Sequence, residues 1–277
     1  MTESTTPAEP PVILTEVTNR IGIVTLNRPH RRNALNGELI EALDRAVQQM
    51  AQDPGVKVVI LTGAAPEGGH GGFCSGGDVK DGGLKRAPGD DRPMGAAPGT
   101  TDADLDRFDL HAPMLLHTMP KPTIAMIGGP AVGAGFSLAA ACDLRYASDD
   151  AVFAANFSAN GLSGDYGGTL FWTSIIGTAK TRELYYLNER LTADQAYQWG
   201  MVNKVLPAAE LRPYTLSVAE RLVRIPATLL ALVKDNLTQA EQEADRRRRL
   251  FANETRNQQQ AARDIAERLR RRAEGTR

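Results

Sequence analysis

The sequence lacks the residues that hold most metal ions and disulfide frameworks. It has only two cysteines, Cys74 and Cys142, and four histidines among its 277 residues. Two cysteines are too few for a disulfide framework, and neither a Cys-x-x-Cys nor a His-x-x-x-His spacing occurs. A metalloenzyme is therefore disfavoured. A chain of this length can bury a core large enough to fold without disulfides or metal.

An excess of charge of one sign is also missing. The chain carries 32 basic and 33 acidic residues, for a net charge of −1. A general nucleic-acid binder needs a large cationic excess to neutralise phosphates, so this balance argues against one. Any anion that the protein binds must be met by local groups.

Long hydrophobic runs are absent as well. The only uncharged run of membrane-spanning length, residues 122–142, is interrupted by Pro130 and four glycines. Residues 1–11 are rich in Thr, Glu and Pro without the hydrophobic core of a signal peptide, and they predict a disordered tail. We therefore expect a cytoplasmic protein with no membrane partner.

What is present is the alternation of strand and helix patterns typical of an α/β protein, over residues 12–207. Strand patterns occupy residues 12–17, 21–26, 56–62, 122–127, 144–155 and 202–205. A first helix pattern follows Asn36, which we expect to be its N-cap, and further helix patterns cover 105–119 and 133–142. Another helix begins at 169–176. The last one in this part starts at a Thr192–Gln195 capping box and ends at Gly200. Beyond residue 207 only helical patterns remain, so we place a boundary there and predict a helical C-terminal region over 208–277.

One segment breaks this alternation. Residues 81–103 are crowded with Gly, Pro and Asp and keep no apolar period. A loop of this length within a compact domain is usually functional or disordered.

Two glycine-rich segments, 73–78 (FCSGGD) and 128–137 (GGPAVGAGFS), each follow a predicted strand. Glycines let backbone amides approach a ligand oxygen closely, and the start of a following helix favours negative charge there. Two such loops could form an oxyanion hole. The glycines could equally serve only tight turns and close helix packing.

A nicotinamide site is a further interpretation of the second segment. Gly129, Gly133 and Gly135 fit the phosphate loop of short-chain dehydrogenases. That loop, however, belongs to the first strand and helix of a dinucleotide-binding fold, whereas this one lies beyond residue 120. The sequence also has no Tyr-x-x-x-Lys. Both facts argue against a dehydrogenase.

Several motifs together resemble the crotonase (enoyl-CoA hydratase/isomerase) superfamily over roughly residues 12–240. They are NRP at 27–29, NALN at 33–36, FCSGGDVK at 73–80, KPTIAMIGGPAVGAGFSLAAACDLRYAS at 121–148, GLSGDYGGT at 161–169 and LTADQAYQWGMVNKVLP at 191–207. The resemblance implies an α/β fold, a crotonase-like spiral of ββα repeats with a helical C-terminal trimerisation region, in a homotrimer or homohexamer. It further implies an acyl-CoA thioester as substrate, with no cofactor beyond the coenzyme A that the substrate carries.

By motif position, the resemblance assigns the oxyanion hole to the backbone amides of Gly77 and Ala134. Charge that collects on a thioester oxygen is stabilised by amides already in place, which supports this assignment. The same resemblance puts the adenine end of coenzyme A near the segment 31–35, which includes Ala34, and the pantetheine near Ser75 and Gly76.

Two cations, Arg32 and Lys80, are candidate partners for the phosphates of coenzyme A. Both could equally be ordinary solvated side chains.

The sequence departs from the family where hydratases hold two glutamates. Ser137 and Phe157 stand at those two substrate-facing positions. A serine can hold a water but cannot act as its base at neutral pH, and a phenylalanine can do neither. Addition of water by a glutamate pair is therefore disfavoured.

One carboxylate remains near these positions, Asp165 in the segment 161–169. Its placement resembles the catalytic aspartate of ring enoyl-CoA isomerases of phenylacetate degradation and of 4-chlorobenzoyl-CoA dehalogenase. Asp165 could instead act as the N-cap of the following helix. Among the histidines, His111 is the one we keep as a pocket candidate.

The leading hypothesis is double-bond isomerisation of an enoyl-CoA, in which Asp165 carries the proton. Three alternatives stay open: an enoyl-CoA hydratase, attack of Asp165 on an aryl-CoA, and a weakly catalytic protein that binds CoA thioesters.

Overall fold

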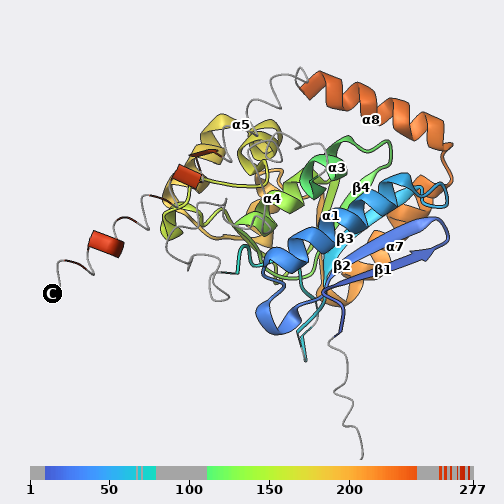
Figure 1. Ribbon diagram of the computed structural model, residues 1–277. Helices are drawn as coiled ribbons and strands as arrows, with labels where there is room; N and C mark the ends of the chain where they lie inside the picture. The colour runs from blue at the N-terminus through green and yellow to red at the C-terminus, as the bar shows by residue number, and fades with distance from the viewer. Residues whose placement is uncertain are drawn as a thin grey trace, which may run out of the picture.

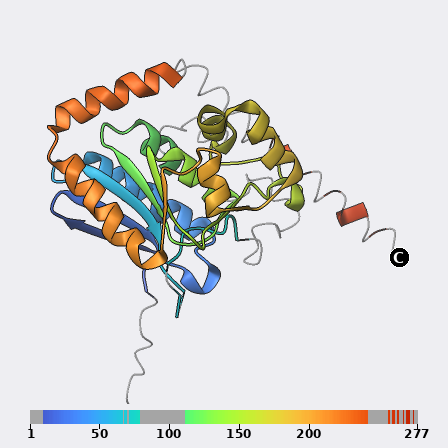
Figure 2. The same ribbon diagram turned by 180° about the vertical axis from the view of Figure 1, so that it is seen from behind.

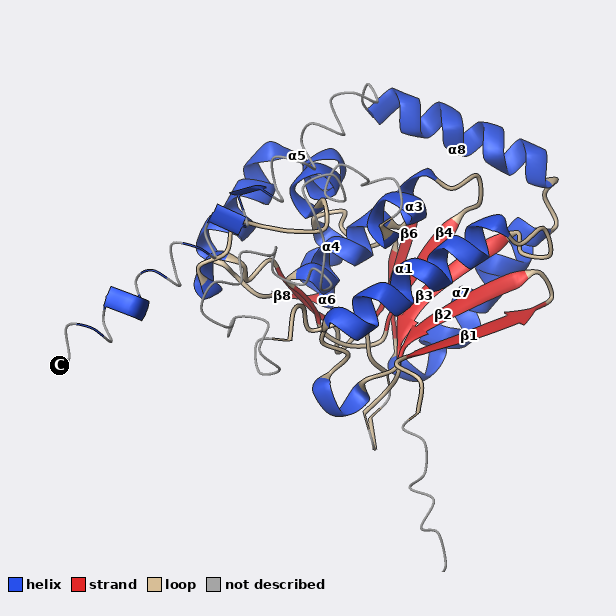
Figure 3. Ribbon diagram, in the orientation of Figure 1, coloured by secondary structure: helices blue, strands red, loops and turns tan. Residues whose placement is uncertain are grey.

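The computed structural model describes residues 10–78 apart from 67 and 70, residues 111–241, and scattered helical residues between 256 and 274. Lys80, the segment 81–103 and most of the predicted N-terminal tail lie outside the described residues. The described chain contains a six-stranded and a three-stranded sheet with helices packed around them (Figures 1 and 3).

The larger sheet has the strand order β1-β2-β3-β4-β6-β9. Its strands are β1 Ile13–Thr18, β2 Ile21–Leu26, β3 Val58–Gly63, β4 Thr123–Ile127, β6 Leu144–Ser148 and β9 Lys204–Leu206. The first pair is an antiparallel hairpin, and the other strands pair in parallel. The branched apolar runs predicted to be buried strands therefore form the centre of this sheet, where both faces are covered.

The smaller sheet joins β5 Ala131–Val132, β7 Val152–Ala154 and β8 Leu191–Thr192. The prediction of a single strand over 144–155 was wrong. A turn closed by the Ala151 amide on the Ser148 carbonyl separates β6 from β7 and carries the chain from one sheet to the other. The strand-forming residues on both sides hide this turn from a pattern analysis.

The helices of the core are α1 Gly37–Gln52, α3 Ala112–Thr118, α4 Ala134–Ala141, α5 Gly168–Leu187 and α6 Ala193–Gln198, with short 3-10 turns at Pro29–Arg31 and Ser158–Asn160. The predicted caps are confirmed: the Asn36 side chain accepts from the Leu39 amide, and Thr192 and Gln195 form a capping box. Strand, strand and helix succeed one another as β1-β2-α1, β4-β5-α4 and β6-β7-α5, which confirms the ββα repeats.

The helices described in the C-terminal part up to residue 241, α7 Ala208–Val223 and α8 Ala227–Glu241, differ in character. Helix α7 lies on the face of the sheet opposite α1 (Figure 2) and buries Leu211, Val218 and Ala219 against alternate residues of the central strands. Helix α8 lies at the edge of the described structure and contacts α3 (Figure 1). No helix among the described residues is both long and apolar enough to cross a membrane.

Candidate active site

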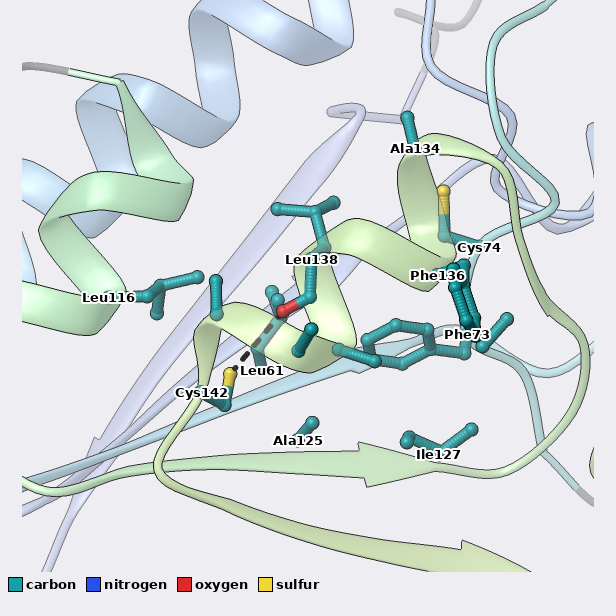
Figure 4. Packing of buried hydrophobic residues seen from close by; sticks show 14 of the residues in the cluster. Leu61, Phe73, Cys74, Leu116, Ala125, Ile127, Ala134, Phe136, Leu138 and Cys142 are labelled. Atoms are coloured by element: carbon teal, nitrogen blue, oxygen red, sulfur yellow. Dashed lines mark hydrogen bonds between the residues drawn. The ribbon is translucent and has the colours of Figure 1, made fainter. Parts of the chain in front are cut away.

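The two glycine-rich loops run side by side as a short parallel ladder. The Cys74 amide donates to the Pro130 carbonyl at 3.1 Å, and the Val132 amide donates to the Cys74 carbonyl at 3.0 Å. These bonds pair Cys74 with Ala131 in parallel register. Figure 4 shows Cys74 beside the Ala134 end of α4. The first loop is therefore fixed against the segment that leads into α4.

The two loops stay close as far as the residues that precede the predicted oxyanion-hole residues. Gly76 precedes Gly77 and Gly133 precedes Ala134, and a Cβ built on either glycine would lie 3.5 Å from the Cα of the other. Both glycines have positive φ, 96° and 56°, which other residues rarely adopt.

The direction of the Gly77 amide follows from its neighbours. The Gly76 carbonyl accepts from the Leu35 amide at 2.8 Å, and the Asp78 amide donates to the Leu35 carbonyl at 2.8 Å. In a trans peptide the N–H points opposite to the preceding carbonyl, so the Gly77 N–H points away from Leu35. It donates no hydrogen bond to any residue that the structure describes.

The Ala134 amide is oriented by the helix that it begins. The Gly133 carbonyl accepts from the Ser137 amide at 3.1 Å, so the Ala134 N–H of the same peptide points out of the start of α4. Within the described part of the chain it has no acceptor. Two unpaired amides, one with a helix dipole behind it, are suited to hold the negatively charged oxygen of a thioester enolate.

The residues predicted to meet coenzyme A lie along the same loop. The Ser75 amide donates to the Arg32 carbonyl at 3.1 Å. Ala34 is buried, and the next residue, Leu35, donates its amide hydrogen bond to the Gly76 carbonyl. Arg32 is exposed, so its side chain can reach a phosphate of coenzyme A. The structure thus brings together Arg32, Ala34, Ser75 and Gly76, whereas Lys80 is outside the described residues.

The two positions that carry glutamates in hydratases are closed by packing. Ser137 is completely buried, and a Cβ built on Gly168 at the start of α5 would lie 2.2 Å from its Oγ. The same Cβ would lie 2.4 Å from the Tyr185 Oη. Phe157 is 5% exposed and stacks on the Tyr185 ring, with 5.8 Å between ring centroids. Close helix packing and ring stacking therefore occupy the space next to the first-glutamate position.

Asp165 lies in the loop that precedes α5. The alternative role as the N-cap of that helix was wrong, because Gly167 is the N-cap. The Asp165 Oδ1 instead accepts from the Tyr166 amide at 2.6 Å, and Tyr166 has a φ of 58°, an uncommon value for a bulky residue. Burial raises the pKa of Asp165 from 3.8 to about 6, against the opposing effects of that bond and of His111.

His111, the pocket candidate among the histidines, is within electrostatic range of Asp165. Its Nδ1 lies 2.9 Å from the Asp44 Oδ2, and the other oxygen of Asp44 accepts from the Ala112 amide at 2.7 Å. The bond to Asp44 raises the pKa of His111 above 6.5. Sequence reasoning missed Asp44, because a polar residue on an amphipathic helix carries no signal of its partner.

The described part of the site has neither a cluster of metal-binding side chains nor a thiolate nucleophile. No group of three or more His, Cys, Asp or Glu side chains there could hold a metal ion. Burial raises the pKa of the Cys74 thiol to about 12, so at neutral pH it is a packing residue and not a nucleophile.

This fold and its paired amides define an acyl-CoA-processing enzyme of the crotonase superfamily. The family model "Enoyl-CoA hydratase/isomerase" matches residues 16–274, and the chain belongs to that family. Two solved structures, an enoyl-CoA hydratase from Mycobacterium avium subsp. paratuberculosis K-10 and an enoyl-CoA hydratase/isomerase from Xanthobacter autotrophicus Py2, are 29% and 30% identical, each with a TM-score of 0.75. Matches cover 90% of this chain in both cases, and 93% and 87% of those chains.

Characterised relatives include enzymes with different reactions. The chain is 33% identical to 1,2-epoxyphenylacetyl-CoA isomerase of Escherichia coli K12 over 83% of its own length and 82% of that protein. It is 30% identical to 4-chlorobenzoyl coenzyme A dehalogenase-1 of an Arthrobacter species, over 83% and 79% of the two chains. The comparisons therefore establish the family and the class of substrate, and leave the reaction to be argued from the site.

Proposed function

We propose that the protein isomerises the carbon–carbon double bond of an enoyl-CoA thioester. The Gly77 and Ala134 amides bind the thioester oxygen. The Asp165 carboxylate removes a proton from the α carbon of a 3-enoyl thioester, or from the γ carbon of a 2-enoyl thioester. The electron pair of the broken C–H bond is delocalised onto the thioester oxygen as a dienolate. The carboxyl group then returns the proton to the other end of the dienolate, so the double bond shifts and no atom is gained or lost.

The observation that carries this proposal is the environment of Asp165. A pKa of about 6 lets this carboxyl group be ionised at neutral pH and still accept a proton readily, as a general base and acid must. An ordinary exposed carboxylate would be a weaker base. The 33% identity to 1,2-epoxyphenylacetyl-CoA isomerase supports isomerisation of a CoA thioester as the general type of reaction.

The alternatives have weaker support. Hydration would need a held and activated water, yet Ser137 is completely buried under the start of α5 and Phe157 is stacked on Tyr185. Nucleophilic attack of Asp165 on an aryl-CoA is favoured by one specific observation, the 30% identity to a dehalogenase. A weakly catalytic binding protein would keep the two amides but would have no use for a carboxyl group with a raised pKa.

A substrate panel tests the proposal. We would incubate the protein with 2-enoyl-, 3-enoyl- and halogenated aryl-CoA esters in deuterated water and follow products by chromatography and mass. Isomerisation predicts a product of different retention time whose mass is unchanged except for deuterium that enters at carbon when the Asp165 carboxyl proton exchanges with solvent. A product heavier by one water would favour hydration, loss of halide would favour nucleophilic attack, and no turnover would favour a binding protein.

We further propose that the protein is a homotrimer or homohexamer that uses α8. Leu229, Leu232, Val233 and Leu237 on this helix are 47–62% exposed, while Leu230 and Lys234 are buried. Light scattering at micromolar concentration should give a trimer or hexamer mass, and Leu232→Glu should lower it. A wild-type monomer would contradict the proposal. A cytoplasmic location stays a prediction.

A further inference from the structure

A buried ion pair lies directly behind the Gly77 amide. The Arg28 Nη1 is 2.9 Å from the Asp78 Oδ2, and the two side chains are only 7% and 4% exposed. The same Nη1 donates to the Ala34 carbonyl at 2.5 Å. One guanidinium nitrogen of Arg28 therefore links Ala34, the residue before Leu35, to Asp78, the residue after Gly77.

These contacts enclose the backbone bridge that sets the direction of the Gly77 N–H. The bridge consists of the Leu35 amide on the Gly76 carbonyl and the Asp78 amide on the Leu35 carbonyl. If the two segments separated, the Gly76–Gly77 peptide could rotate and its N–H would no longer point in a fixed direction. A Cβ on Gly77 would meet nothing within 4 Å, so side-chain packing around Gly77 does not prevent this rotation.

Energetics argue against stability as the only reason for this pair. Taking two charges out of water costs about as much as their attraction returns, and apolar replacements are often as stable. A polar link of fixed geometry is useful where an atom must be held in one orientation. Arginine suits this role because its planar group can bind a carboxylate and a carbonyl together.

We propose that Arg28 and Asp78 are positioning residues that fix the Gly77 amide for binding of the thioester oxygen. This inference rests on the proposed function, because it assumes that Gly77 contacts that oxygen. It adds to the site two residues that do not touch the substrate, and it links the segment around Ala34 to the oxyanion hole.

The test compares Asp78→Asn with a matched control. Asp78→Asn keeps the shape and one acceptor but removes the charge that holds Arg28. The control is Asp143→Asn at the ion pair of Asp143 with Lys234, whose side chains are 30% and 7% exposed. Because Asp143 lies beyond the far end of α4, this change removes a carboxylate charge from an ion pair without touching the oxyanion loop.

The decisive measurement is the infrared carbonyl band of a bound acyl-CoA labelled with ¹³C at the thioester carbon, together with kcat, KM and the Kd of free coenzyme A. For Asp78→Asn we expect the band to move toward its position in solution and kcat to fall about 10- to 100-fold, below the loss for a whole donor. KM and the Kd of free coenzyme A should change less than threefold. The control should lower the melting temperature and leave the band in place.

An unmoved band and an unchanged kcat in Asp78→Asn would overturn the inference, as would a loss of free coenzyme A affinity that accounts for the whole defect. If Asp78→Asn does not fold, Arg28→Lys keeps the charge without the planar group and should shift the band in the same direction by less. A wild-type band identical to that in solution would instead refute the oxyanion hole, and with it the proposed function.

Discussion

The two sides of the candidate site are built from different material. On the proposed oxyanion side, both groups are backbone amides, and the loops that carry them are joined at the Cys74–Ala131 bridge. On the proposed proton-transfer side, side chains decide: Ser137 and Phe157 are buried, and Asp165 is a carboxyl group whose pKa is raised by burial. Backbone geometry survives changes of side chain, whereas acid–base chemistry does not, so one fold can keep enolate binding and vary the reaction.

The largest effect should come from Asp165→Asn, which removes the proton carrier but keeps the shape. Turnover should fall about 100- to 10,000-fold, while thioester binding measured by calorimetry persists. The folded-state pKa of about 6 lies above the ordinary 3.8, so Asp165 costs stability as pH rises through this range. Asparagine, which carries no charge, should therefore raise the free energy of unfolding at pH 7. Unchanged turnover would refute the assignment.

The oxyanion side can be tested by removing an N–H without changing a side-chain function. Ala134 is the first residue of α4, where proline is accommodated, so Ala134→Pro should delete one donor and keep the helix. We expect kcat/KM to fall about 100- to 1,000-fold. Ala208→Pro, at the first position of α7, is the matched control and should leave kinetics unchanged. Equal activity of the two variants would mean that the Ala134 amide does not contact the transition state.

The closure of the Ser137 position can be tested by a single methyl group. Gly168→Ala would place a Cβ 2.2 Å from the Ser137 Oγ and 2.4 Å from the Tyr185 Oη. This overpacking should destabilise the fold by about 1 to 3 kcal/mol in urea titrations. Gly37→Ala, at the start of α1 with nothing within 4 Å, should be neutral or slightly stabilising. A tolerated Gly168→Ala would show room near Ser137 and would reopen hydration.

The smallest effect concerns pH. If Asp165 acts as a base, kcat/KM should rise about tenfold per unit up to a pH of about 6 and then level off. Protonated His111 lowers the pKa of Asp165, so His111→Gln should move this rising limb of the kcat/KM profile to higher pH. His117→Gln removes a histidine that packs on Phe171, and it should leave the limb in place. A limb that moves to lower pH in His111→Gln would contradict the electrostatic link.

Local patterns in the sequence were sufficient for much of the fold. The Asn36 cap, the Thr192–Gln195 capping box and the alternation of strands with helices all depend on residues within a few positions of one another. The two glycine loops could be located for the same reason, since a positive φ at Gly76 and Gly133 is a local requirement. Motif order then identified the family.

The tertiary structure alone decided which of these local pieces meet and what each side chain does there. The Arg28–Asp78 pair spans 50 positions and His111–Asp44 spans 67, distances over which no periodicity carries information. The sequence pattern allowed Asp165 to be either a helix cap or a base. Its environment excluded the cap and raised the pKa, because desolvation depends on the whole surrounding shell of residues and not on the neighbours in the chain.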